Sequence, residues 1–173
     1  MTRVRIRRSG TVVCRAVLRL PLSAQNVWGQ LRDFSRYAQQ DVFHADIRIA
    51  GGTPKAGAEL TMTHGLAGIS VTRIGRILWW REGVGYSFSD LSRRGPRCGF
   101  PHIFSYRIKP DSRKPDTACT LIILVRGKWT ARFIPRPLAR LWLKWVFSRV
   151  VHNVENNLLV YRLWRRNRFP GRR

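Results

Sequence analysis

The segment RAVLRLPLSAQNVW, residues 15–28, decides the fold prediction, because it changes from a strand pattern to a helix pattern at one proline. Over residues 11–20, Cys14, Ala16, Leu18 and Leu20 fall on one face of an alternating pattern, which predicts a half-buried strand. Pro21 ends that strand, and Ser23 is suited to cap a helix that carries Val27 and Trp28. The following residues, LRDFSRY at 31–37, predict a second short helical turn through Phe34 and Tyr37.

Downstream of Asp41 the pattern changes to short β-like runs separated by glycine and proline. The predicted strands cover residues 45–50, 58–65, 68–80, 84–91, 102–109 and 117–130. Their connections are short, whereas parallel neighbours would need long crossovers. The pattern therefore predicts an antiparallel meander.

From about residue 137 to 165 the chain contains neither glycine nor proline, which predicts one long helix. The stripe expected to face the sheet consists of Leu143, Val146, Phe147, Val150, Val151, Val154, Leu158 and Tyr161. A second apolar set, on roughly the opposite side, consists of Leu138, Leu141, Trp145, Leu159 and Leu163. The helix is thus predicted to be apolar on two sides.

The charge balance is the unusual feature of the composition. In 173 residues, 33 Lys and Arg face only 9 Asp and Glu, a formal net charge of +24, and there is no acid between Asp116 and Glu155. Such a surface attracts polyanions. Two interpretations fit this pattern. One is a docking face for nucleic acid, anionic lipid or an acidic protein, and the other is a surface that only increases solubility. We expect a single domain over residues 11–165, with basic tails at 1–10 and 166–173.

Cysteine usage and hydropathy indicate the compartment. Cys14, Cys98 and Cys119 form no CxxC motif and are odd in number, so neither a disulfide framework nor a zinc site is predicted. The longest strongly apolar run, 118–125, is far shorter than the roughly 20 residues of a membrane-spanning helix. We therefore expect a cytoplasmic protein, with peripheral association at a membrane as a further hypothesis.

The sequence resembles the START-like or SRPBCC superfamily in four places. These are the segments 15–28 and 31–37, Gly57 before the strand from Ala58 to His64, and the stretch 104–108 before the strand that ends in Trp129. Within this superfamily, the pattern is most similar to the polyketide cyclase/dehydrase and lipid-transport branch. The resemblance implies the α+β helix-grip fold, in which a curved antiparallel sheet wraps around a long C-terminal helix and two short helices follow the first strand. It also implies a cavity between sheet and helix that holds a lipid, quinone, hormone or polyketide. One departure is the extreme positive charge, which leaves the partner open.

Strand alternation identifies the side chains expected to face that cavity. The candidate ligand-binding residues are Met62, His64, Tyr86, Phe88, Asp90, His102, Phe104, Tyr106 and Ile123. The polar members among them are expected to orient the polar end of an otherwise apolar ligand. In a catalytic version, a His or Asp acts as general base on a polyketide-like carbonyl and Tyr hydroxyls hold the oxyanion. Each of these residues also suits an ordinary structural role.

Motifs for cofactor chemistry are absent from the sequence. There is no P-loop, no GxGxxG and no GxSxG, and the four histidines are too scattered for a local metal motif. We therefore expect no cofactor and no metal.

The start of the predicted long helix mixes cations with tryptophan and leucine. Arg136, Arg140, Trp142, Lys144 and Trp145 are the residues expected to contact a membrane or another polyanion. Stacking of single-stranded bases on the same residues ranks lower, because no nucleic-acid recognition motif accompanies them.

The leading hypothesis is a noncatalytic carrier or sensor of a hydrophobic small molecule such as a lipid, quinone or polyketide. A polyketide cyclase or aromatase that uses the same cavity is the alternative, and a nucleic-acid-binding module is the third. The first hypothesis needs only the cavity and the charge, whereas the second needs several polar groups to converge and the third needs a recognition element.

Overall fold

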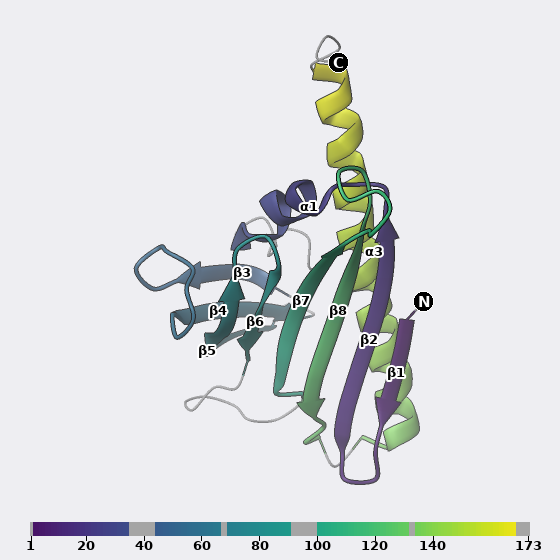
Figure 1. The fold of residues 1–173 in the computed structure, drawn as a ribbon. Helices are drawn as coiled ribbons and strands as arrows, with labels where there is room; N and C mark the ends of the chain where they lie inside the picture. Colours follow the sequence, from purple (N-terminus) through teal and green to yellow (C-terminus); the bar gives the residue numbers. More distant parts are fainter. Residues whose placement is uncertain (1, 35–43, 67–68, 91–99, 132–133, 169–173) are drawn as a thin grey trace.

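The chain folds into one curved antiparallel sheet with a long helix on its inner side (Figure 1). The computed structural model describes residues 2–34, 44–66, 69–90, 100–131 and 134–168. In chain order the elements are β1 (Thr2–Ile6), β2 (Thr11–Leu20), α1 (Ala24–Leu31), β3 (His44–Ile49), β4 (Glu59–Leu66), β5 (Ile69–Arg81), β6 (Gly85–Ser89), β7 (His102–Pro110), β8 (Cys119–Lys128) and α3 (Arg136–Arg168).

The eight strands lie in the order β1-β2-β8-β7-β6-β5-β4-β3, and every neighbouring pair is antiparallel. The six strands predicted after Asp41 agree with β3 to β8 to within two residues at each end. The meander is closed by β2, in which Thr11 pairs with Lys128 and Leu20 with Cys119. Figure 1 shows β3 to β5 turned across the upright strands β7, β8, β2 and β1, which gives the sheet its curvature.

The beginning of the chain differs from the expected basic tail over residues 1–10. Residues Thr2–Ile6 form β1, which pairs with β2 from Thr2 opposite Ala16 to Ile6 opposite Val12. The turn between the strands contains Gly10, whose φ of 79° is favoured by glycine. Val4 is buried, while Arg3 and Arg5 flank it on the other face. The arginines made this segment resemble a solvated tail, although Val4 and the half-buried Ile6 form the inner face of a short strand.

Helix α1 forms where the sequence predicts it. The Asn26 backbone N–H donates to Ser23 Oγ at 3.2 Å, which satisfies one of the otherwise unbonded amides at the helix start. Val27, Trp28 and Leu31 are buried, and so is Phe34 just beyond the helix. The second short helical turn, including Tyr37, falls mainly on residues 35–43, outside the described part of the chain.

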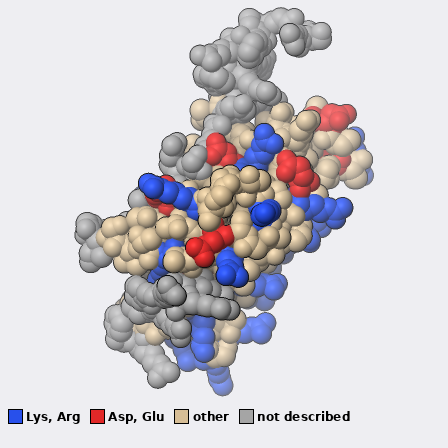
Figure 2. Space-filling view, turned by 90° about the vertical axis from the view of Figure 1, so that its left-hand side faces the viewer, with Lys and Arg blue, Asp and Glu red and all other residues tan. Residues whose placement is uncertain are grey.

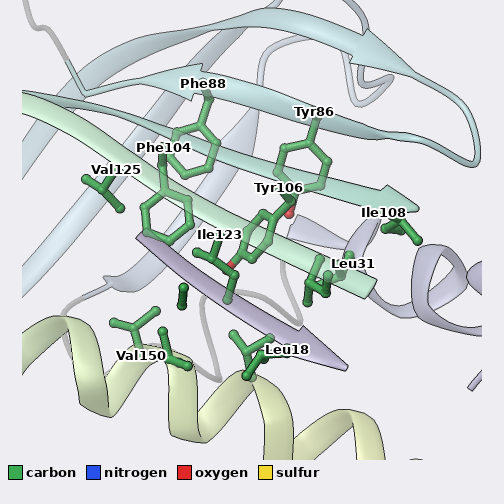
Figure 3. Packing of buried hydrophobic residues seen from close by; sticks show 14 of the residues in the cluster. Leu18, Leu31, Tyr86, Phe88, Phe104, Tyr106, Ile108, Ile123, Val125 and Val150 are labelled. Atoms are coloured by element: carbon green, nitrogen blue, oxygen red, sulfur yellow. The ribbon is translucent and has the colours of Figure 1, made fainter. Parts of the chain in front are cut away.

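Helix α3 packs on the inner face of the sheet and lies nearest to β1 and β2. Its buried face consists of Ala139, Leu143, Phe147, Val150, Val151, Val154 and Leu158. This confirms most of the predicted stripe. Val146 is half-buried, and the side chain of Tyr161 lies outside the described part of the chain. Figure 3 shows Val150 of α3 and Leu18 of β2 between the helix and the sheet. No helix in the described ranges is long and apolar enough to span a membrane.

Candidate functional site

The inner face of the sheet carries a continuous cluster of aromatic side chains. Tyr86 and Phe88 project from β6 beside Phe104 and Tyr106 of β7, with Ile123 of β8 next to them (Figure 3). The Phe88 and Phe104 rings stack at a centroid distance of 5.7 Å, and the Tyr86 and Tyr106 rings meet edge to face at 5.4 Å. These five side chains and Met62 of β4 are all buried, as the strand alternation predicts.

Three further aromatic residues complete this cluster from the side of α1. Phe34 lies 4.9 Å from Tyr86 between ring centroids, and Trp28 and Trp80 lie 6.2 Å and 5.4 Å from the same ring. Trp80 faces inward because the β5–β6 register shifts between Ile77 and Trp79. Strict alternation from Ile77 would have turned Trp79 inward instead, so the irregularity conceals this contact in the sequence.

A charged cluster lies at one end of the aromatic cluster. The carboxylate of Asp90, just after β6, is buried with 1% of its side chain exposed. Its Oδ2 accepts a hydrogen bond from Arg73 Nη1 at 2.9 Å. The same oxygen lies 3.5 Å from His102 Nδ1 and 3.6 Å from His64 Nε2. We call these four residues the Asp90 cluster.

The position of one proton in the Asp90 cluster follows from hydrogen-bond chemistry. His102 Nδ1 lies 2.8 Å from the carbonyl oxygen of Phe100. A carbonyl oxygen only accepts, so Nδ1 carries the proton in this bond. In the neutral ring Nε2 is then the nitrogen that can accept a proton. The Phe100 ring stacks on the imidazole at a centroid distance of 5.0 Å, which further fixes its plane.

The polar residues expected to act together divide into two groups. His64, Asp90 and His102 converge, whereas Tyr86 and Tyr106 pair with each other. Tyr86 lies four residues from Asp90, and Tyr106 lies four residues from His102. At the usual rise per residue, this separates the tyrosine pair from the Asp90 cluster by about 13 Å. Arg73 was not among the candidates. It faces inward because it pairs with Met62 of β4, a register that local sequence does not reveal.

Two other polar side chains are buried beside the aromatic cluster and on α1. The Tyr86 hydroxyl and the Gln30 side-chain amide have no hydrogen-bond partner among the described residues. Burial raises the pKa of Tyr86 above its usual range, so this hydroxyl keeps its proton. Gln30 was not predicted, because one glutamine on a short amphipathic helix gives no signal of burial.

Within the described residues, no group of His, Cys, Asp and Glu side chains is arranged to hold a metal ion. Cys14 and Cys119 are free and buried, and burial raises the pKa of their thiols to about 12 and about 11. They are therefore inert packing residues rather than nucleophiles.

The residues expected to contact a membrane or polyanion lie along the first turns of α3. Arg136, Arg140 and Lys144 are exposed, and Trp142 and Trp145 are 39% and 52% exposed. The Trp142 ring lies 5.9 Å from that of Trp129, and the Arg149 guanidinium lies over the Trp145 ring at 5.7 Å.

Comparisons with known proteins identify the fold but no close relative. No family model and no curated protein matches the sequence. Among solved structures, the Zhui aromatase/cyclase from Streptomyces sp. R1128 is 17% identical with a TM-score of 0.67, over 93% of this chain and 98% of that one. A START superfamily protein from Mycobacterium smegmatis is 16% identical with a TM-score of 0.66, over 86% of this chain and 98% of that one.

A third structure, that of Ara h 8.0201, is 12% identical with a TM-score of 0.63, over 87% of this chain and 99% of that one. Almost the full length of each of these three proteins is matched. The curved antiparallel sheet and the long terminal helix therefore give this protein the helix-grip fold of the START-like proteins.

Proposed function

We propose that the protein binds a hydrophobic small molecule such as a lipid, quinone or polyketide on the inner face of the sheet, with the polar end of the ligand at the Asp90 cluster. The observation that carries this proposal is the position of that cluster. The His102 ring meets the Phe104 ring at 6.4 Å, and Phe104 stacks on Phe88, so charged and aromatic groups adjoin. Ligand sites typically combine a mainly apolar surface with a few placed polar groups.

The cost of burying the Asp90 cluster supports a role beyond folding. Buried ion pairs often stabilise a protein no more than apolar side chains of the same volume would. Arg73 and Asp90 are 14% and 1% exposed at their side chains. A polar ligand group that bonds to this cluster would use charges that the fold already holds in place.

Native mass spectrometry followed by organic extraction tests the proposal. Protein purified from cells is expected to carry apolar material, and Phe104→Trp and Met62→Trp should reduce it because they enlarge buried side chains on the inner face. Leu78→Trp is the matched control, since Leu78 lies on β5 and is 48% exposed. Equal ligand content in all three variants would place binding elsewhere.

A cyclase or aromatase activity is the second candidate, and the fixed orientation of His102 favours it. In this version Nε2 of His102 removes a proton from the carbon next to a ketone, and the Arg73 guanidinium stabilises the enolate oxygen. Arg73 takes this role in place of the tyrosines, because Arg73 and His102 both lie against the Asp90 carboxylate, whereas Tyr86 lies four residues away from Asp90.

Hydrogen exchange of a ketone probe separates the two candidates. If His102 is a base, the protein should accelerate deuterium incorporation into the methyl group of acetophenone in heavy water, followed by NMR. His102→Gln should abolish the acceleration, whereas ligand content in the extraction experiment should fall less than it does for Phe104→Trp. No acceleration by the wild-type protein would leave binding as the function.

A further inference from the structure

Four large apolar side chains form an exposed stripe at the start of α3. They are Leu138, Leu141, Trp142 and Trp145, with exposed fractions of 58%, 65%, 39% and 52%. Their spacing of three and four residues places them on one side of the helix. The residues that pack on the sheet, such as Leu143 and Phe147, lie on the other side. We call this set the apolar stripe of α3.

Cations accompany the apolar stripe of α3. Lys144 is exposed beside Leu141 on the flank of the stripe, and Arg149 lies over the Trp145 ring, whereas Arg140 is exposed on the side of the helix away from the stripe. No Asp or Glu occurs in the sequence between Asp116 and Glu155. The opposite situation holds on the side that carries β3 to β5, where Figure 2 shows acidic side chains interspersed with basic ones. Positive charge without compensating acids is therefore a property of the start of α3, which it shares with residues 1–32, where no Asp or Glu occurs either.

The apolar stripe of α3 lies at the same end of the sheet as the Asp90 cluster. His102 pairs with Gly127 at the end of β8, and Trp129, two residues later, contacts Trp142 of the stripe. Figure 1 shows α3 beginning at the end of the sheet where β7 starts and β8 ends. A surface bound to the stripe would thus lie near the end of the inner face that holds the polar cluster.

We propose that the apolar stripe of α3 docks the protein on an anionic lipid bilayer. Tryptophan rings favour the headgroup level, leucines favour the acyl boundary, and lysine and arginine bind lipid phosphates. The stripe offers all three together. Nucleic-acid phosphates would use the cations alone and would leave Leu138 and Leu141 without a role. The proposal does not depend on which ligand, if any, the inner face binds.

Vesicle flotation tests the proposal with the full chain. The wild-type protein should float with vesicles of phosphatidylcholine and phosphatidylglycerol, and not with phosphatidylcholine alone. Leu141→Ser and Trp145→Ala should each weaken binding about tenfold through lost apolar contact. Lys144→Gln with Arg149→Gln should weaken it by more than tenfold at low salt, at roughly fivefold for each cation.

Matched variants elsewhere on the surface provide the controls. Leu78→Ser removes another exposed leucine, and Arg15→Gln with Arg19→Gln removes two exposed cations from β2. If the stripe docks, the leucine control should float like the wild type and the arginine control should weaken binding less than the α3 pair does.

Two results would overturn the proposal. One is equal flotation of Leu141→Ser, Trp145→Ala and Leu78→Ser. The other is a protein that does not float with anionic vesicles but binds a single-stranded oligonucleotide tightly, and that loses this binding when the α3 cations are replaced. Far-ultraviolet circular dichroism of each variant checks that the fold is retained, and extraction of bound ligand is measured separately, so a failure of docking is distinct from a failure of ligand binding.

Discussion

Replacing Asp90 by asparagine should destabilise the protein strongly, because it leaves Arg73 buried without its carboxylate. At 2.9 Å, the Asp90–Arg73 attraction is about 6 kcal/mol with an effective dielectric constant of about 20, most of which offsets desolvation. Removing one partner of a buried pair costs about 3 to 5 kcal/mol. Because the Arg73 side chain is 14% exposed, we expect the lower end, about 3 kcal/mol.

Urea unfolding followed by tryptophan fluorescence measures this effect. With a slope of about 2 kcal/mol per molar, a loss of about 3 kcal/mol lowers the midpoint by roughly 1.5 M. Asp46→Asn is the control, since the Arg48–Asp46 pair is 81% and 42% exposed and should contribute at most about 1 kcal/mol. The double variant Arg73→Met with Asp90→Asn should recover part of the loss. A midpoint for Asp90→Asn no lower than that for Asp46→Asn would refute the reasoning.

Three further predictions concern α1, α3 and the thiols. The hydrogen bond from Trp28 Nε1 lowers the pKa of Glu82 below its ordinary 4.5. The stabilisation that ionised Glu82 provides is therefore present above pH 4.5 and is lost as the pH falls through the pKa of the folded state. When Tm is measured against pH, it should fall less steeply in acid for Glu82→Gln than for the wild type. Phe147→Ala should cost about 3 to 5 kcal/mol and Trp145→Ala at most about 0.5 kcal/mol in urea unfolding, because only Phe147 is buried; similar losses would contradict the packing of α3. In a Cys98→Ser background, Cys14 and Cys119 should not react with Ellman's reagent at pH 8 until the protein is unfolded, and rapid labelling of the native protein would contradict their burial.

The sequence predicts the elements of the sheet better than it predicts the contacts between them. Alternation within one strand identifies which side chains share a face, and this placed His102 and Phe104 together on the inner face. It contains no information on which residue lies opposite, so the pairing of Met62 with Arg73 could not be anticipated. Arginine on a strand normally indicates solvent, and the buried carboxylate of Asp90 stabilises Arg73 in the inward position that the register imposes.

Local irregularity accounts for other differences. The register shift near Trp79 reverses the expected alternation, which is why Trp80 joins the aromatic cluster. The strand β1 was hidden because its outer face consists of arginines. The cavity and the roles of the candidate residues remain predictions, since they depend on a ligand rather than on pattern.

The pairing of β2 with β8 has a consequence for how the chain is made. Thr11 finds its partner only when Lys128 has been synthesised, and the inner face of β1 and β2 is covered only when α3 follows. Such distant pairing slows folding, since the intervening chain must first be closed into a loop. The early strands therefore leave the ribosome with unsatisfied edges and exposed apolar faces, a state in which β proteins aggregate readily. Efficient production of this protein should accordingly depend on chaperones that hold the nascent chain until the last helix emerges.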